Sequence, residues 1–290
     1  MARLPIQKTY KLFIGGKFPR TESGRYLQVR DEKGTLVANV CRASRKDFRM
    51  AVVAARKAQS GWAARTPFNR GQILYRMAEM LESRAASFVD LIMTTTGAKK
   101  KDATSEVECA IDRLVWYAGW CDKFTQVFGC TNQVASSHFN FTMPEPLGVV
   151  TSFAPSSASL LGIVQAMAPA ITQGNVVIAV TPIELAPVAI EFAEVLATSD
   201  LPGGVVNILT GETSELHGHV TSHMDVDGVL AFGVDQETQV AMGQAAADSV
   251  KRIKFADDPG LAALMEPEAQ SPYQILPWVE FKTAWHPIGI

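Results

Sequence analysis

The sequence predicts an α/β fold in which a helical layer precedes a doubly wound parallel sheet. From Gly148 onward, short apolar segments alternate with helical segments, a spacing typical of parallel strands joined by helices. Between Ser44 and about Gln126, apolar residues instead recur with the period of a helix. The 290 residues are 47% hydrophobic and 19% charged, which favours a folded globular chain over a disordered one.

The first segment, residues 10–42, predicts short strands and turns. KLFIGGKF alternates around Gly15 and Gly16, and RDEKGTLVANV predicts two strands with a turn at Gly34. A half-exposed antiparallel strand is predicted over residues 133–143, because its aromatic side chains alternate with polar ones.

Three helices are predicted in the helical layer. Ser44 caps the first, and Asp47 at the third helical position completes an arrangement close to a capping box. The second begins near Pro67 and continues as one apolar stripe to Val89. The third begins at Ala103.

The α/β part is predicted to hold five strands with a helix after each of the first four. The predicted strands are 147–153, 175–180, VVNILTG, DGVLAFG and 252–255, and the predicted helices are 159–171, 187–198, 214–222 and 237–249. Periodicity is lost after Gly260, so residues 265–277 are expected to be irregular, and VEFKTAW is expected to be one more strand.

Charge and composition exclude several classes of partner. The net charge is −2, with 27 Lys and Arg against 29 Asp and Glu, so no basic surface favours nucleic acid. No apolar segment is long enough to cross a bilayer, and the N-terminus lacks the apolar core of a secretory signal. The four cysteines form no C-x-x-C pair, which is typical of reduced thiols. We therefore expect a cytoplasmic protein without nucleic-acid or membrane partners.

A metal site is not expected. His219 and His223 are four residues apart and would share one face of a predicted helix, but no third ligand is evident. A solvated helix face is the better interpretation.

Seven segments, in this order, resemble the aldehyde dehydrogenase superfamily: LFIGGKF, SGWAARTPFNRGQILYRMAEMLESRA, TTTGAKKKDATSEVECAIDRLVWYAGW, EPLGVVTSFAP, MAPAITQGNVVIAVTP, LPGGVVNILTG and DGVLAFG. The resemblance implies a Rossmann-type NAD-binding domain with an oligomerisation strand inserted at residues 137–143. In the family, a separate catalytic domain then carries a nucleophilic cysteine.

The sequence departs from the family pattern at each catalytic group. No cysteine follows Cys130, Ala256 stands where the general-base glutamate is expected, and Ser157 stands where the oxyanion-donating asparagine is expected. Asp257 and Asp258 belong to an Asp-Asp-Pro sequence that favours a solvated or capping turn. Because these groups are absent, we expect no catalytic residues in this sequence.

The cofactor site is retained in part. The ribose-contacting lysine of the family corresponds to Val180 or Thr181, depending on a one-residue shift, and Glu184 corresponds to the glutamate that accepts from the adenosine ribose. The vestigial site would comprise five residues: Thr181, Pro182, Glu184, Gly211 and Gly233. Asp235 would place a negative charge near the pyrophosphate, so NAD binding is expected to be weak or absent.

The closing VEFKTAW resembles the last strand of the family, which follows the catalytic domain and docks onto a neighbouring subunit. We therefore expect a Rossmann-type domain at 1–132 and 146–264, oligomerisation strands at 133–145 and 274–290, and a linker at 265–273 where the catalytic domain is absent. The arrangement is similar to the non-catalytic second half of the two-domain family-16 aldehyde dehydrogenases.

Three functions remain open from the sequence. The first is a non-catalytic subunit that assembles with a full-length, NAD-dependent aldehyde dehydrogenase, which converts aldehydes to carboxylic acids. The second is an NAD-binding module or an active oxidoreductase in its own right. The third is a structural homo-oligomer held by the same edge strands.

Overall fold

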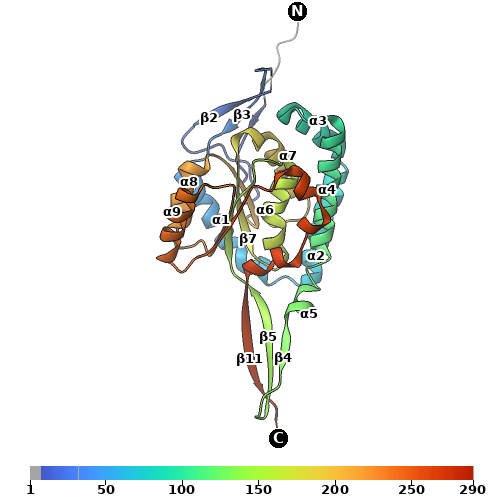
Figure 1. The fold of residues 1–290 in the computed structure, drawn as a ribbon, viewed down its shortest axis with the longest axis vertical. Coiled ribbons are helices and arrows are strands. Elements are labelled where there is room, and N and C mark those ends of the chain that lie inside the picture. The colour runs from blue at the N-terminus through green and yellow to red at the C-terminus, as the bar shows by residue number, and fades with distance from the viewer. Residues whose placement is uncertain (1–7, 32, 290) are drawn as a thin grey trace, which may run out of the picture.

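A five-stranded parallel sheet, in the order β10-β9-β6-β7-β8, forms the centre of the computed structural model (Figure 1). Its strands are β6 (Val149–Phe153), β7 (Val176–Thr181), β8 (Val206–Thr210), β9 (Gly228–Phe232) and β10 (Arg252–Ala256). Every residue of β6, β7 and β8 is buried, because helices cover both faces of the sheet. The predicted parallel α/β fold is confirmed.

The structure describes residues 8–31 and 33–289. The expectations about a secretory signal and about the start of the first domain therefore lie partly outside the described residues. Among those residues, no helix has both the length and the apolar composition needed to cross a membrane.

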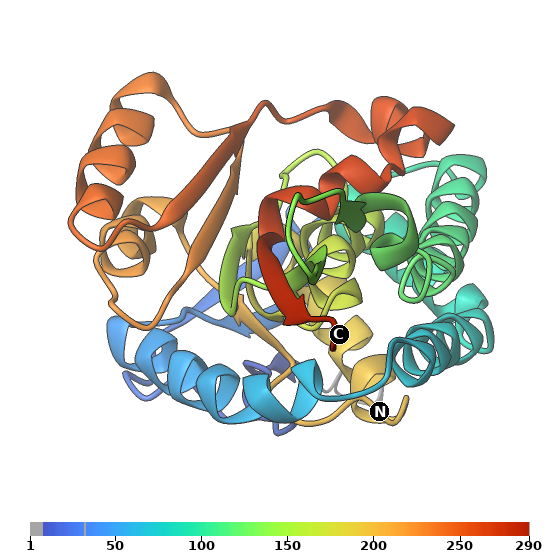
Figure 2. The same ribbon diagram turned by 90° about the horizontal axis from the view of Figure 1, so that it is seen from below.

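Helices form three layers around the sheet. One face carries α1 (Arg45–Ala63), α8 (Thr213–Thr221) and α9 (Gln236–Ala247), and the other carries α6 (Leu160–Thr172) and α7 (Ala186–Ala197). The outer layer packs against α6 and α7 and consists of α2 (Pro67–Glu82), α3 (Ala85–Thr96) and α4 (Lys100–Ala118), followed by the short α5 (Phe124–Phe128). Figure 2 shows this layer on the side of α6 remote from the sheet.

The predicted start of the first helix is confirmed, but the predicted second helix is two helices in the structure. The capping box of α1 is present, with Ser44 Oγ accepting from the Asp47 N–H and the Asp47 side chain accepting from the Ser44 N–H. The predicted second helix is wrong as one element, because α2 ends at Glu82 and α3 begins at Ala85. The apolar stripe continues through both helices, since both bury it, so the period alone does not reveal the break.

The N-terminal part of the chain forms a second sheet. Its strands are β1 (Thr9–Tyr10), β2 (Tyr26–Arg30) and β3 (Leu36–Cys41), in the order β1-β3-β2. Phe13 attaches this region to β8, because its backbone exchanges two hydrogen bonds with Ile208.

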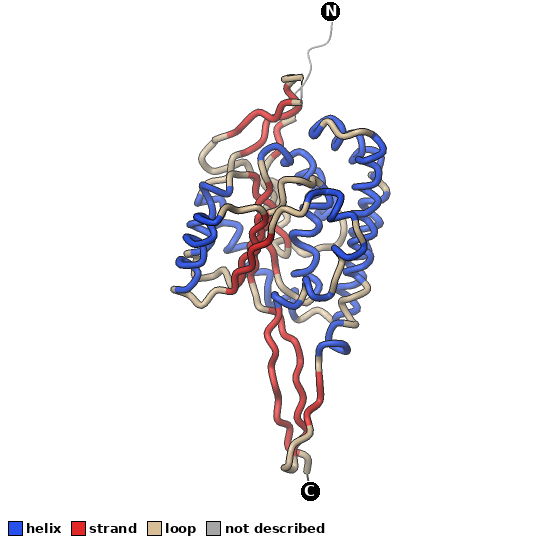
Figure 3. The backbone as a smooth tube through the Cα atoms, viewed as in Figure 1, coloured by secondary structure: helices blue, strands red, loops and turns tan. Residues whose placement is uncertain are grey.

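A third, antiparallel sheet projects from the body as a narrow ribbon (Figures 1 and 3). It consists of β4 (Cys130–Asn132), β5 (His138–Pro146) and β11 (Val279–Pro287), with β5 in the middle. The strand predicted over 133–143 begins five residues too early, and β4 was not predicted because three residues show no alternation. β11 pairs with β5 along its whole length, from Val279 opposite Pro146 to Pro287 opposite His138.

Buried hydrogen bonds fasten the base of the ribbon to the amino ends of the parallel strands. The fully buried Asn175 accepts from the Gly148 N–H (2.8 Å) and donates to the carbonyls of Trp278 (2.8 Å) and Ala170 (3.0 Å). Arg252 of β10 donates to the carbonyl of Val279 at 2.8 Å. The ribbon is therefore a continuation of the body rather than a loosely attached arm.

Residues 257–278 connect β10 to the ribbon. They form α10 (Gly260–Met265) and three 3-10 turns, η2 (Pro267–Ala269), η3 (Pro272–Gln274) and η4 (Leu276–Trp278). α10 was not predicted, because six residues are too few for a helical period. The buried Arg113 of α4 holds this segment by donating to the Leu264 carbonyl at 2.7 Å.

We expect Gly204→Ala to destabilise the fold far more than Gly34→Ala. Both glycines have positive φ (98° and 78°), a conformation that costs an alanine about 1–2 kcal/mol. A Cβ at Gly204 would lie 2.6 Å from the carbonyl oxygen of Ala54, whereas nothing lies within 4 Å of a Cβ at Gly34. Overpacking adds about 1–3 kcal/mol at Gly204. Urea unfolding of both variants measures the difference, and equal losses would contradict this packing.

Candidate functional site

The strand order of the parallel sheet locates the candidate site. From β6 the chain moves outward to β7 and β8, and then crosses to β9 and β10 on the other side of β6. Open α/β sheets bind ligands outside the carboxyl ends of their strands, at the point where the strand order reverses. Here the strand order reverses between β6 and β9, and we call the edge between their carboxyl ends the crevice.

The five residues predicted from the sequence all lie at the carboxyl ends of strands, on this edge of the sheet. Thr181 is the last residue of β7, and Pro182 and Glu184 come directly after it. Gly211 follows β8 and Gly233 follows β9. The structure thus brings these residues to one edge of the sheet, and their role in binding a cofactor stays a prediction.

Two of these residues are used in packing. The carbonyl of the buried Thr181 accepts a hydrogen bond from the Gly211 N–H at 3.2 Å. A Cβ at Gly211 would lie 3.2 Å from Leu216 and 3.6 Å from Ala43, so protein atoms already occupy the space beside it. Glu184 is exposed in η1 (Ile183–Leu185), the 3-10 turn that precedes α7.

Asp258, which follows β10, lies at the crevice and is held by the loop after β6. Its Oδ2 accepts from the Ser156 N–H (2.8 Å), the Ser156 hydroxyl (2.9 Å) and the Ser157 N–H (3.0 Å). Its Oδ1 accepts from the Ser157 hydroxyl and from the Gly260 N–H. We call Asp258, Ser156 and Ser157 the carboxylate clamp.

The carboxylate clamp also fills the space beside β9. Gly233 has a positive φ of 63°, and a Cβ there would lie 3.2 Å from the Cβ of Asp258. The three strands β6, β9 and β10 therefore meet at this one side chain. Partial burial opposes ionisation of Asp258, but the hydrogen bonds from Ser157, Ser156 and Gly260 outweigh it, so the pKa of Asp258 is lowered.

Acidic side chains lie at the N-termini of three helices that follow strands of the sheet. One of them, Glu106, reaches the start of α6 from α4. Glu106, 2% exposed, accepts from the Ser159 hydroxyl (3.0 Å) and the Leu161 N–H (3.1 Å) at the start of α6. Burial raises the pKa of Glu106 despite these hydrogen bonds. Asp235 caps α9 by accepting from the Thr238 N–H at 2.8 Å, which lowers the pKa of Asp235.

The first turn of α8 carries the third acidic residue, Glu215. It pairs with Arg42 at 2.5 Å and with Arg25 at 3.4 Å, so its charge is balanced within the chain. Negative charge is favourable at each of these helix starts, because the helix dipole is positive there.

The four thiols are not arranged as an activated nucleophile at the crevice. Cys41 and Cys121 are buried, Cys109 is half-buried and Cys130 is exposed. Burial raises the pKa of Cys121 to about 12 and also raises that of Cys109, whereas a nucleophilic cysteine needs a lowered pKa. Cys130 belongs to β4 in the ribbon, at the opposite end of the sheet from the crevice.

The histidines do not share a helix face as predicted. α8 ends at Thr221, so His223 lies beyond the helix that carries His219. His223 accepts from the Asp225 N–H at 3.2 Å and packs edge-on against Phe48. Across the described part of the chain, no three His, Cys, Asp or Glu residues are grouped as metal ligands.

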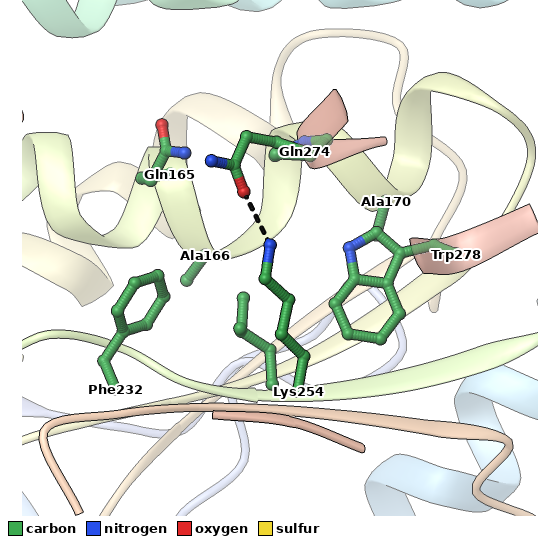
Figure 4. A pocket seen from close by; sticks show the side chains of 9 residues that line it. Gln165, Ala166, Ala170, Phe232, Lys254, Gln274 and Trp278 are labelled. Carbon is green, nitrogen blue, oxygen red and sulfur yellow. Dashed lines mark hydrogen bonds between the residues drawn. The ribbon is translucent and has the colours of Figure 1, made fainter. Parts of the chain in front are cut away.

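A small cavity lies between α6 and the strands β9 and β10, beneath the connecting segment (Figure 4). Its volume is about 10 Å³, which is room for a single water molecule. Lys254 points into it and donates to Gln274 Oε1 at 3.0 Å, beside the ring of Trp278. Burial lowers the pKa of Lys254. The cavity is too small for a cofactor and marks where the connecting segment covers the sheet.

The carboxylate clamp was not predicted from the sequence. The sequence predicts a solvated or capping turn at Asp258, whereas Asp258 accepts from four donors of the loop after β6. Glu106 was also missed, because it lies on a helix of ordinary amphipathic pattern. The adjacent Ser156 and Ser157 after a buried strand are the one signal in the sequence that could have indicated an anion-binding loop.

Comparisons with known proteins agree on the relatives of the chain. The family described as "Aldehyde dehydrogenase family" matches residues 19–256. DhaS of Bacillus subtilis (strain 168), which is named as an aldehyde dehydrogenase, is 31% identical over 284 residues and covers 96% of this chain. Cytosolic 10-formyltetrahydrofolate dehydrogenase of Xenopus laevis is 30% identical over 258 residues and covers 87% of this chain.

A solved structure has the same fold. It is the NAD+ complex of an aldehyde dehydrogenase from Bacillus cereus, with a TM-score of 0.81, 24% identity and 86% coverage of this chain. The chain spans 54% of DhaS, 28% of the Xenopus protein and 51% of the Bacillus cereus chain.

The carboxylate clamp makes stability dependent on pH in acid. We expect Asp258→Asn to cost about 1–2 kcal/mol at pH 7, because a charged acceptor of several hydrogen bonds is lost at a partly exposed site. Since the pKa of Asp258 is lowered on folding, the advantage of the wild type is full above the ordinary Asp pKa of about 4. It is lost as the pH falls through the lowered pKa.

Urea unfolding of both proteins between pH 2.5 and 7 measures this difference. Asp257→Asn is the matched control, because Asp257 is exposed. A difference between wild type and Asp258→Asn that stays constant over this range would refute the assignment of the hydrogen bonds to the ionised carboxylate.

Proposed function

Because the chain belongs to the aldehyde dehydrogenase family, we propose that it is a non-catalytic subunit that assembles with a full-length aldehyde dehydrogenase. The partner would carry out the NAD-dependent oxidation of an aldehyde to a carboxylic acid. This chain would contribute its ribbon to the assembly.

The observation that carries the proposal is the pairing of β11 with β5. β11 follows β10 through residues 257–278, yet it forms nine residue pairs with β5, which precedes the parallel sheet. In the family resemblance, this last strand serves contacts between subunits and follows a catalytic domain. A ribbon fastened to the body by Asn175 and Arg252 supports a role in assembly.

Both faces of the ribbon carry exposed apolar side chains. Residues directly opposite each other share a face, so Phe139 and Met143 lie on one face, and Phe281 and Trp285 on the other. All four are at least 44% exposed, and Trp285 is 58% exposed. Apolar side chains gathered on a projecting element are typical of an interface with another protein.

The chemistry of the described residues supports a non-catalytic role. Oxidation of an aldehyde in this family needs a thiolate, and the sequence has no cysteine after Cys130. Ala256, at the end of β10, offers no carboxylate for hydrolysis of a thioester. Asp258, two residues later, is engaged in the carboxylate clamp.

The proposed division of the chain follows from the same reasoning. Residues 1–132 and 146–264 would form the Rossmann-type domain, 133–145 and 274–290 the oligomerisation strands, and 265–273 the linker that replaces a catalytic domain. The family match ends at residue 256, at the end of β10, which supports this division.

The second candidate is an NAD-binding module or an oxidoreductase. It is favoured by the position of Thr181, Glu184, Gly211 and Gly233 at the carboxyl edge, and by the NAD+ complex of the Bacillus cereus relative. Reduction of NAD+ by an aldehyde in the presence of the purified chain alone would establish this candidate and overturn the first.

We expect the double variant Phe281→Asp/Trp285→Asp to lose assembly. Two carboxylates in place of apolar side chains would have to be buried at the interface without partners, which costs several kcal/mol. The chain and a full-length aldehyde dehydrogenase from the same organism are co-expressed, and light scattering after size exclusion gives the mass of the complex. We expect at least a tenfold loss of co-eluting chain.

Phe68→Asp is the matched control, since Phe68 is 67% exposed on α2, away from the ribbon. It should co-elute like the wild type. Failure of the wild type to bind any such partner would overturn the proposal, and a defined multiple of its own mass would instead favour a homo-oligomer.

A further inference from the structure

We infer that Asp258 acts as a tethered anion that occupies the donors of the loop after β6, so that this scaffold excludes the dinucleotide that its fold would otherwise bind. The inference concerns the carboxyl edge of the sheet and stands apart from the proposed assembly, which uses the ribbon at the amino edge.

The first argument is the place of the carboxylate. The strand order reverses between β6 and β9, and Asp258 lies at the carboxyl ends of these strands. It accepts from the N–H groups of Ser156 and Ser157 after β6, and it would lie 3.2 Å from a Cβ at Gly233 after β9. Two backbone N–H groups and two hydroxyls converging on one pair of oxygens are the donor set that an anionic ligand group would need.

The second argument is that carboxyl groups of the chain already occupy helix-start donors that a pyrophosphate would use. Helix N-termini attract anions, and the pyrophosphate of dinucleotides uses this attraction in Rossmann-type folds. Here Glu106 accepts from the Leu161 N–H at the start of α6, and Asp235 accepts from the Thr238 N–H at the start of α9.

A dinucleotide would therefore add two negative charges to an edge that already carries the carboxylates of Asp235 and Asp258. The like charges repel, and the N–H groups of Leu161 and Thr238 are already engaged. Neither Val180 nor Thr181, the two positions that the resemblance offers for a ribose-contacting lysine, supplies an ammonium to offset this. The residues of this edge thus do not fit the dinucleotide.

The third argument is what the carboxylate clamp does for the connecting segment. Asp258 ties the start of residues 257–278 to the loop after β6, and Arg113 ties Leu264 to α4. These two contacts hold the segment over the carboxyl half of the sheet. The segment that leads to the ribbon is thereby attached to the loop after β6 and to α4.

Calorimetric titration of the intact wild-type chain with NAD+ gives the first test. We expect no saturable heat at millimolar NAD+. Saturable binding of NAD+ would overturn the inference. Because this titration uses the wild-type chain, it tests the inference even if a variant does not fold.

Asp258→Gly gives the second test, with Asp257→Gly as the matched control. Removing the carboxylate frees the donors of Ser156 and Ser157, so acetate and inorganic phosphate should raise the melting temperature of Asp258→Gly saturably, by about 2–4 °C. Wild type and Asp257→Gly should not respond beyond chloride at the same ionic strength. Equal responses of all three proteins would overturn the inference.

Co-elution with the full-length partner is measured on the same variants. Asp258→Gly should assemble like the wild type, because the ribbon lies at the other end of the strands. A failure of assembly in every protein, with the anion response as expected, would count against the proposed function alone.

Discussion

The buried amide of Asn175 is the contact on which the arrangement of the molecule depends. One side chain receives the backbone of Gly148, where the chain enters β6, and binds the carbonyl of Trp278, where the chain enters β11. Two segments more than a hundred residues apart are thereby fixed at one point of the sheet. A buried amide that lost these partners would leave unpaired polar groups in the interior, which is costly. The position of the ribbon follows from this point, because Asn175 holds the residue pair from which β5 and β11 leave the body.

The opposite end of the sheet is organised by negative charge. Parallel strands followed by helices direct several helix N-termini toward one edge, and each leaves unpaired N–H groups. In this chain, Glu106, Asp235 and Asp258 satisfy donors at that edge. The edge is therefore stable without a bound anion. The same carboxylates leave little positive potential for a phosphate, so the stability of the scaffold and its poor fit to a dinucleotide have one cause.

The sequence predicts most of the fold but only part of the candidate site. β7 can be predicted from its own residues alone, because a strand buried on both faces is apolar throughout. The break between α2 and α3 at Ser83 escaped prediction, since neither Gly nor Pro marks it. The carboxylate clamp escaped for another reason. Asp258 and Ser156 are about a hundred residues apart, and they meet only because β10, β9 and β6 are neighbours, which no local pattern encodes.

The ribbon and the crevice sit at opposite ends of the same strands, and this separation has an evolutionary consequence. Substitutions that erode one end leave the geometry of the other intact, because five rigid strands separate them. After a gene duplication, selection could thus abandon ligand chemistry while still preserving quaternary contacts. If the proposed assembly holds, a family with this architecture gains partners for its own enzymes without a new fold.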